Sequence, residues 1–124
     1  MDKQSCVLLY NLKGTSKGAE LGMMFSFLGY RIVHVEPPQY NRPVGQLVGV
    51  LPVTPSAPCK ENFSDEMLVI YTEDDEQLEK ALFLMKQENQ LVNLKAVLTE
   101  MNRYWTSLAL HHELGREHEA LHKK

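Results

Sequence analysis

Four short, continuous apolar segments constrain the fold of this chain more than any other feature. They cover residues 6–10, 31–35, 67–71 and 95–99, and each is rich in Val, Ile, Leu or Tyr. None of them alternates strictly between apolar and polar residues, as a strand with one face in solvent would. Continuous apolar runs of this length are typical of strands that are buried on both faces. We therefore expect a central sheet that is covered on both sides.

Helical patterns lie between these segments. Apolar residues recur three and four positions apart within residues 16–28 and 75–87, and a last helix is expected over residues 102–122. Asp74 can cap the second helix, and Gln77 three residues later completes a capping box. Strand and helix patterns thus alternate along the chain, which favours βαβ units with right-handed crossovers.

These patterns predict one α/β domain over residues 1–124. The preferred architecture is a four-stranded, mostly parallel sheet with flanking helices and the strand order 2-1-3-4. The alternative is a ferredoxin-like split βαβ sheet with the order 4-1-3-2, in which the second and third strands are antiparallel neighbours. The continuous apolar strands favour the first architecture. Gly45 and Gly49 each weaken the expected middle helix by about 1 kcal/mol relative to Ala, which keeps the second architecture open.

The segment between the second and third strands differs from the rest, because all 6 prolines fall within it. A short helix is still expected there, on a stripe formed by Val44, Leu47, Val48 and Leu51. An irregular loop is expected from Pro52 to Asp65. A loop of this length is unusual in a compact domain and is often a binding segment, although a solvated surface loop is the commoner case.

The composition limits the classes of function. The chain has 124 residues with 13 Lys+Arg and 16 Asp+Glu, a net charge of -3, and its basic residues are scattered. Nucleic acid is not an expected partner, because nucleic-acid binding relies on a clustered basic field. No apolar run approaches the roughly 18 residues of a membrane span, so no membrane partner is expected. Cys6 and Cys59 are expected to be reduced thiols of a cytoplasmic protein.

A candidate ligand site lies beyond the carboxyl ends of the expected strands. The first strand is followed by a glycine-bearing turn and a helix start, where free backbone N–H groups and lysine side chains can bind an anion. The spacing of Gly14, Gly18 and Gly22 also lets that helix lie close to the sheet. The fourth strand ends in residue types that cap helices, and ligands of open parallel sheets bind beyond such strand ends. The predicted ligand-binding residues are Asn11, Lys13, Thr15, Thr99 and Asn102.

A zinc-peptidase pattern occurs in the last helix. The segment from His118 to His122 reads H-E-A-L-H, in which two histidines can bind one metal and the glutamate can act as a base. The third ligand that such families carry downstream has no counterpart in Lys123 and Lys124. His111 shares the helical stripe but lies about 10 Å from His118 along the axis, too far for one compact site. No metal site, catalytic residue or cofactor is therefore predicted.

Six segments carry a family resemblance: LLYNL (8–12), LGYRIVHVE (28–36), PVGQLVGVL (43–51), DEMLVIY (65–71), LKAVLTEMNRYW (94–105) and HHELGREH (111–118). Together they resemble a small bacterial family, domain-of-unknown-function family 3783, over most of the chain. The most specific part is the strand–turn–helix pattern that starts at Leu94 and includes Asn102 and Trp105. The resemblance implies a bacterial origin, no established activity and no zinc motif.

The leading functional hypothesis is a non-catalytic, cytoplasmic binding or regulatory module with an unknown partner. A homodimer through the C-terminal helix is compatible with it. The alternative is a small enzyme or sensor that binds an anionic metabolite at the carboxyl ends of the strands. A zinc hydrolase is third, so the sequence leaves open whether the protein is an enzyme.

Overall fold

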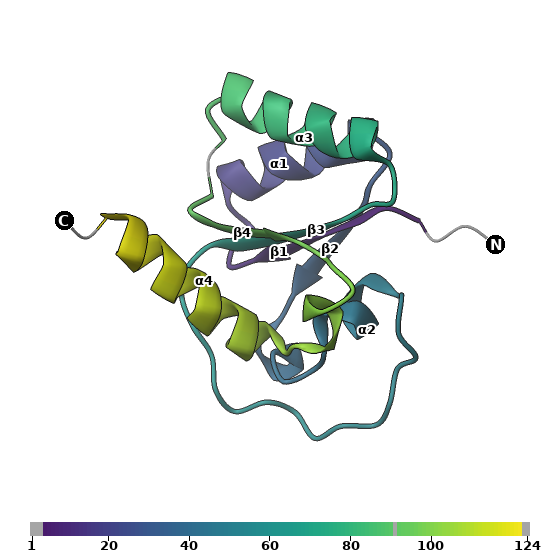
Figure 1. Ribbon diagram of the computed structural model, residues 1–124, viewed down its shortest axis with the longest axis vertical. Helices are drawn as coiled ribbons and strands as arrows, with labels where there is room; N and C mark the ends of the chain where they lie inside the picture. Colours follow the sequence, from purple (N-terminus) through teal and green to yellow (C-terminus); the bar gives the residue numbers. More distant parts are fainter. Residues whose placement is uncertain (1–3, 91, 123–124) are drawn as a thin grey trace.

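The computed structural model describes residues 4–90 and 92–122 (Figure 1). Four strands form one sheet with helices on both faces, which confirms the α/β class. In chain order, the elements are β1 (Cys6–Tyr10), α1 (Ser16–Phe27), β2 (Arg31–Val35), the 3-10 turn η1 (Pro37–Gln39), α2 (Val44–Val48), β3 (Met67–Tyr71), α3 (Asp75–Gln87), β4 (Leu94–Val97), the 3-10 turn η2 (Asn102–Tyr104) and α4 (Ser107–His122).

The strand order is β2-β1-β3-β4, as predicted, but the sheet is mixed. β1 is parallel to β2 and β3 is parallel to β4, whereas β1 and β3 are antiparallel. The prediction of a mostly parallel sheet thus holds for the two outer pairs and not for the central pair. The physical reason is the connection from β2 to β3, which starts and ends at the same end of the sheet, since Met67 pairs with Tyr10. The ferredoxin-like order is not formed.

Both faces of the sheet are buried, which explains why its central strands are continuously apolar. One face packs on α1 and α3 through Val7, Leu9, Leu68 and Ile70. The other face packs on α2, α4 and part of the long connection that precedes β3 (Figure 1). A continuous apolar run reports this two-sided burial and carries no information about strand direction.

The close approach of α1 to the turn that follows β1 depends on a single glycine. Thr15 caps α1 by accepting a hydrogen bond from the backbone N–H of Gly18. A Cβ atom on Gly18 would lie only 2.0 Å from the carbonyl oxygen of Leu12. Gly14 and Gly22 have no atom within 4 Å of an added Cβ, so of these three glycines only Gly18 makes a close approach, and it is to the turn rather than to a strand of the sheet.

Several predicted boundaries shift for local reasons. The middle helix, α2, ends at Val48, because Gly49 adopts a left-handed conformation with φ of 94°. The fourth strand ends at Val97, and residues 102–104 form η2 before α4 starts at Ser107, so the predicted single helix over residues 102–122 is wrong at its start. Among the described residues, no helix combines the length and the hydrophobicity that crossing a membrane requires.

The long connection before β3 has no regular secondary structure from residue 52 to residue 64, as expected. It nevertheless contacts the rest of the domain through hydrogen bonds and ring stacking. The Arg42 guanidinium donates to the Thr54 carbonyl, and the Asn41 amide donates to the Ala57 carbonyl. Nearer β3, the Phe63 ring stacks on other rings of the domain.

We predict opposite effects for two alanine substitutions in the same helix. Gly18→Ala should destabilise the protein by about 1–3 kcal/mol, because the new methyl group overlaps the Leu12 backbone. Gly22→Ala meets open space and should stabilise the protein by about 0.5–1 kcal/mol through helix propensity. Equilibrium unfolding in urea measures both changes, and equal effects of the two substitutions would contradict the packing described here.

Candidate functional site

Two adjoining hollows lie on the surface between α1 and α3, with volumes of about 700 Å³ and about 540 Å³. Phe27 and Leu84 line both of them, so the two hollows form one groove. We call it the α1–α3 groove. Its residues are Glu20, Met23, Met24, Phe27, Leu28, Asp74, Glu76, Gln77, Lys80, Phe83, Leu84, Glu88 and Gln90.

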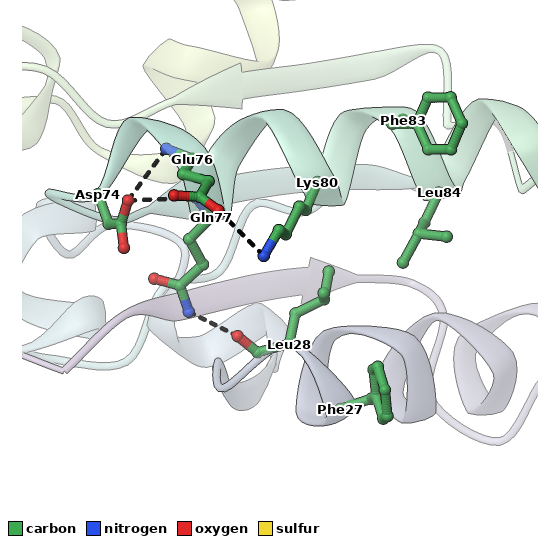
Figure 2. Close-up of a pocket in the computed structure, with 8 residues that line it drawn as sticks. All are labelled: Phe27, Leu28, Asp74, Glu76, Gln77, Lys80, Phe83 and Leu84. Atoms are coloured by element: carbon green, nitrogen blue, oxygen red, sulfur yellow. Dashed lines mark hydrogen bonds and ion pairs between the residues drawn. The ribbon is translucent and has the colours of Figure 1, made fainter.

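The walls of the groove carry large apolar side chains in solvent. Phe27 is 86% exposed, Met23 is 74% exposed and Phe83 is 63% exposed. Figure 2 shows Leu84 on α3 and Leu28 at the end of α1 in the space between the two helices. Isolated exposed apolar residues are common on proteins, but a cluster of them along a hollow marks an interaction surface.

Helix α1 places these side chains in solvent because it is apolar on two sides. Leu21 and Phe25 point into the core and are fully buried. Met23 and Phe27 are also one turn apart, and they face outward. This exposure is unusual, because a helix with apolar residues on all sides is usually buried on every side. The second apolar stripe of α1 is the sequence signal for this groove. A prediction that considers only the stripe facing the core does not identify it.

The rim of the groove is acidic. Its ionisable side chains are Glu20, Glu88, Asp74, Glu76 and Lys80, which are four carboxylates and one ammonium. The Lys80 Nζ lies 3.2 Å from a carboxylate oxygen of Glu76, so the single positive charge is already paired. The groove therefore presents apolar side chains within a field of net negative charge.

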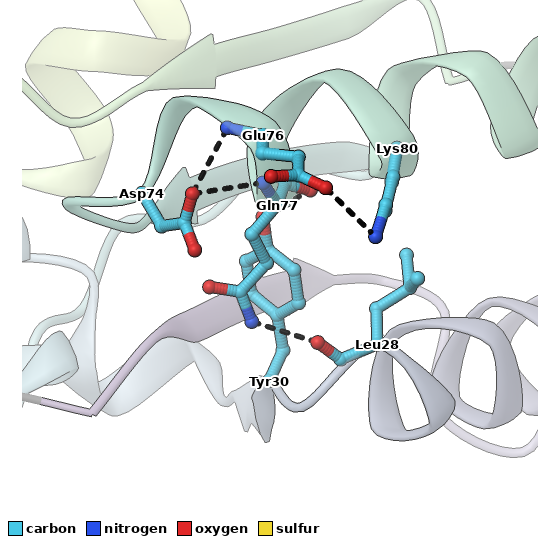
Figure 3. Close-up of polar contacts among 6 residues, drawn as sticks. All are labelled: Leu28, Tyr30, Asp74, Glu76, Gln77 and Lys80. Atoms are coloured by element: carbon cyan, nitrogen blue, oxygen red, sulfur yellow. Dashed lines mark hydrogen bonds and ion pairs between the residues drawn. The ribbon is translucent and has the colours of Figure 1, made fainter.

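A polar network fixes α3 against the end of α1 (Figure 3). The Gln77 Nε2 donates a hydrogen bond of 2.7 Å to the Leu28 carbonyl. The Gln77 Oε1 accepts from the hydroxyl of Thr72 at 2.9 Å and lies 2.7 Å from the hydroxyl of Ser5. The Tyr30 hydroxyl donates to the Gln77 backbone carbonyl at 3.2 Å. Gln77 therefore holds together both walls of the groove at one end.

These contacts correct one sequence prediction. Asp74 caps α3 as expected, by accepting from the backbone N–H groups of Glu76 and Gln77. The capping box is not completed, because the Gln77 side chain is used in the network with Leu28 instead. Burial, with a smaller contribution from the Asp74 carboxylate, raises the pKa of Tyr30 to about 12. Tyr30 therefore stays a neutral hydrogen-bond donor at physiological pH.

The five residues predicted to bind a ligand lie at opposite ends of the sheet. Asn11 follows β1 and donates to the backbone carbonyls of Phe63 and Asp65. At the same end, Thr15 caps α1, and Lys13 pairs with Glu36 at 3.0 Å. The Asn11 and Thr15 contacts are structural, and the Lys13–Glu36 pair is exposed to solvent.

Thr99 and Asn102 follow β4 and hydrogen-bond to each other, with the Thr99 N–H donating to the Asn102 side chain at 2.8 Å. Because β1 and β4 run in opposite directions, Asn11 and Thr99 are separated by about 20 Å along the strands. Thr15 lines one hollow, and Thr99 and Asn102 line a different one. The structure thus does not bring the five residues into one site.

The histidine stripe of the last helix has a structural contact at its start. The His111 Nε2 lies 2.9 Å from a carboxylate oxygen of Asp65, and the His111 ring stacks on Phe63 with the ring centroids 3.8 Å apart. His111 thereby attaches the long connection to α4. Within residues 4–90 and 92–120, whose side chains the structure describes, no three His, Cys, Asp or Glu residues are placed to hold a metal ion. The side chain of His122, and with it the H-E-x-x-H pattern, lies outside the described residues.

A homodimer through the C-terminal helix stays a prediction, and the described part of this helix packs its leucine side chains inward. Leu110 is buried, and Leu108 and Leu114 pack against the core. The described part of α4 has no exposed large apolar side chain, whereas α1 and α3 have several. Exposed apolar side chains also occur just before α4, at Met101 and Tyr104, but those of α1 and α3 gather along one groove.

The comparisons with known proteins agree with the resemblance seen in the sequence. A family model described as a domain of unknown function (DUF3783) matches residues 66–121. This match extends from the start of β3 into α4 and includes α3, one wall of the groove. Comparison with curated proteins and with solved structures gave no significant match.

We predict that the Gln77 network is a large contributor to the stability of this region. Gln77→Leu leaves the Leu28 carbonyl without its side-chain donor and the Thr72 hydroxyl without its acceptor, and it should cost about 1–3 kcal/mol of unfolding free energy. Gln87→Leu, at an exposed position of the same helix, should change it by less than about 0.5 kcal/mol. Urea unfolding of both variants is the measurement. Similar values for the two would rule out the role of Gln77.

Proposed function

We propose that this protein is a non-catalytic binding module and that it binds another protein through the α1–α3 groove. The leading hypothesis from the sequence was a binding module with an unknown partner, and the proposal adds the surface at which that partner binds. It also moves the binding surface away from the carboxyl ends of the strands, where the predicted ligand residues are occupied by structural contacts.

The observation that carries the proposal is the exposure of Phe27, Met23 and Phe83 along one continuous hollow. Burying a side chain of this size contributes about 1.5–3 kcal/mol, so covering the three would supply several kcal/mol toward association. Aromatic residues in such hollows are the usual binding hot spots of protein interfaces. The groove is held by packed helices and by Gln77, so its shape exists before a partner binds.

The proposal includes a bacterial, cytoplasmic setting. The family resemblance supports the bacterial origin. Two free cysteines support a reducing compartment, since Cys6 is buried in β1 and Cys59 lies in the long connection without a disulfide. Burial also raises the pKa of Cys6 to about 11, which keeps it a neutral, unreactive thiol.

Photo-crosslinking tests the proposed function. A photoreactive phenylalanine analogue placed at Phe83 in the full chain should crosslink a specific protein in the cells that make it. That protein is then identified, purified and titrated against the module by calorimetry. We expect Phe27→Glu to weaken its binding by about 30-fold or more, because the variant puts a charge at a hot spot.

The chain offers a matched control for this experiment. Val53 is 72% exposed, like the groove residues, but it lies in the long connection on the other side of the sheet. The analogue at Val53 should not capture the same protein, and Val53→Glu should leave its affinity unchanged. Equal crosslinking from both positions, or equal affinity of Phe27→Glu and Val53→Glu, would show that the groove is not the binding surface.

A further inference from the structure

We propose that the occupant of the α1–α3 groove is a basic amphipathic helix of a partner protein, with two large apolar side chains seven residues apart. This inference rests on the proposed function and adds the chemistry of the partner. It is argued from the spacing of the two hollows and from the charge of their rim.

The spacing of the hollows fits a helix. The residues that line the two hollows are offset by roughly four positions along α1 and roughly seven along α3, which corresponds to about 6–10 Å at the rise of a helix. Residues i and i+7 of a helix lie on one face, about 10.5 Å apart. Grooves between two helices commonly take an amphipathic helix with apolar anchors at such positions. One anchor would enter each hollow, on either side of Phe27 and Leu84.

The negative charge of the groove rim indicates which kind of partner segment the groove binds. Asp74 and Glu76 lie beside the first hollow, and Glu20 and Glu88 lie beside the second, so both anchors are bordered by carboxylates. Lys80 is paired with Glu76 and offsets one of the four negative charges, so the rim keeps a net charge of -3. Lysine or arginine residues that flank the apolar anchors of the partner would complement the rim. Such complementarity raises the association rate and excludes partners of the wrong charge.

The same charge disfavours two other occupants. A second copy of the chain, docked through the same face, would bring four carboxylates of one rim close to those of the other. Like charges opposed across an interface are destabilising. An anionic membrane surface would be repelled for the same reason. A basic segment of another protein is the occupant that satisfies both the apolar side chains of the groove and its acidic rim.

Three helical peptides of one design test this inference. Each carries Leu at positions i and i+7 of one face, with the flanking polar positions filled by Lys, by Gln or by Glu. Binding to the isotope-labelled full chain is followed by NMR shifts of residues in α1 and α3. We expect the Lys peptide to bind at least tenfold more tightly than the Gln peptide and the Glu peptide to bind least. Added salt should reduce the difference.

Charge variants of the protein sharpen the test. The triple variant Glu20→Gln, Glu76→Gln and Glu88→Gln keeps the apolar walls and should lose most of the preference for the Lys peptide. The matched triple variant Glu61→Gln, Glu117→Gln and Glu119→Gln changes exposed carboxylates of the long connection and α4 and should keep that preference.

The outcomes separate the two proposals. Binding of all three peptides to the groove with equal affinity would overturn the basic partner and leave the protein-binding function intact. Absence of binding by any peptide would overturn the helical occupant, whereas the protein-binding function is decided by the crosslinking experiment at Phe83 and Val53. Concentration-dependent shifts of groove residues in the protein alone would show that a second copy is the occupant and would overturn the inference.

Discussion

The antiparallel contact between β1 and β3 is the constraint on which the rest of this structure depends. It joins two βαβ units, β1-α1-β2 and β3-α3-β4, that run in opposite directions. Two right-handed units related in this way are rotated by half a turn about an axis through the sheet, which leaves both helices on the same face. In an all-parallel sheet with the same strand order, α1 and α3 would lie on opposite faces. The groove between them exists because the central pair is antiparallel.

The same contact removes the site that an all-parallel sheet would have had. It places the carboxyl ends of β1 and β4 at opposite ends of the sheet. The polar residues there make local hydrogen bonds; Thr15, for example, caps α1. The two faces of the protein consequently differ. The face with α2, α4 and the long connection is filled by packed rings such as Phe63 and His111, whereas the face with α1 and α3 leaves Phe27 and Phe83 exposed along one groove.

Local patterns predict much of this architecture, and their failures have identifiable physical causes. The bounds of β1, β2, β3 and α3 follow from apolar spacing and from the Asp74 cap. Strand direction does not follow, because a strand buried on both faces has the same composition in either orientation. The role of Gln77 was missed because its partner, Leu28, is distant in sequence. Met23 and Phe27 were visible as a second stripe on α1, but their exposure depends on where α3 lies.

Oxidation of two methionines by peroxide tests the central claim most directly. Met23 in the groove is 74% exposed, and Met101 after β4 is 73% exposed, so the two should oxidise at similar rates in the purified protein. In an extract of the cells that make the protein, a partner in the groove should protect Met23 and leave Met101 unchanged, as measured by mass spectrometry of their peptides. Equal oxidation of the two methionines in the extract would contradict a partner-covered α1–α3 groove.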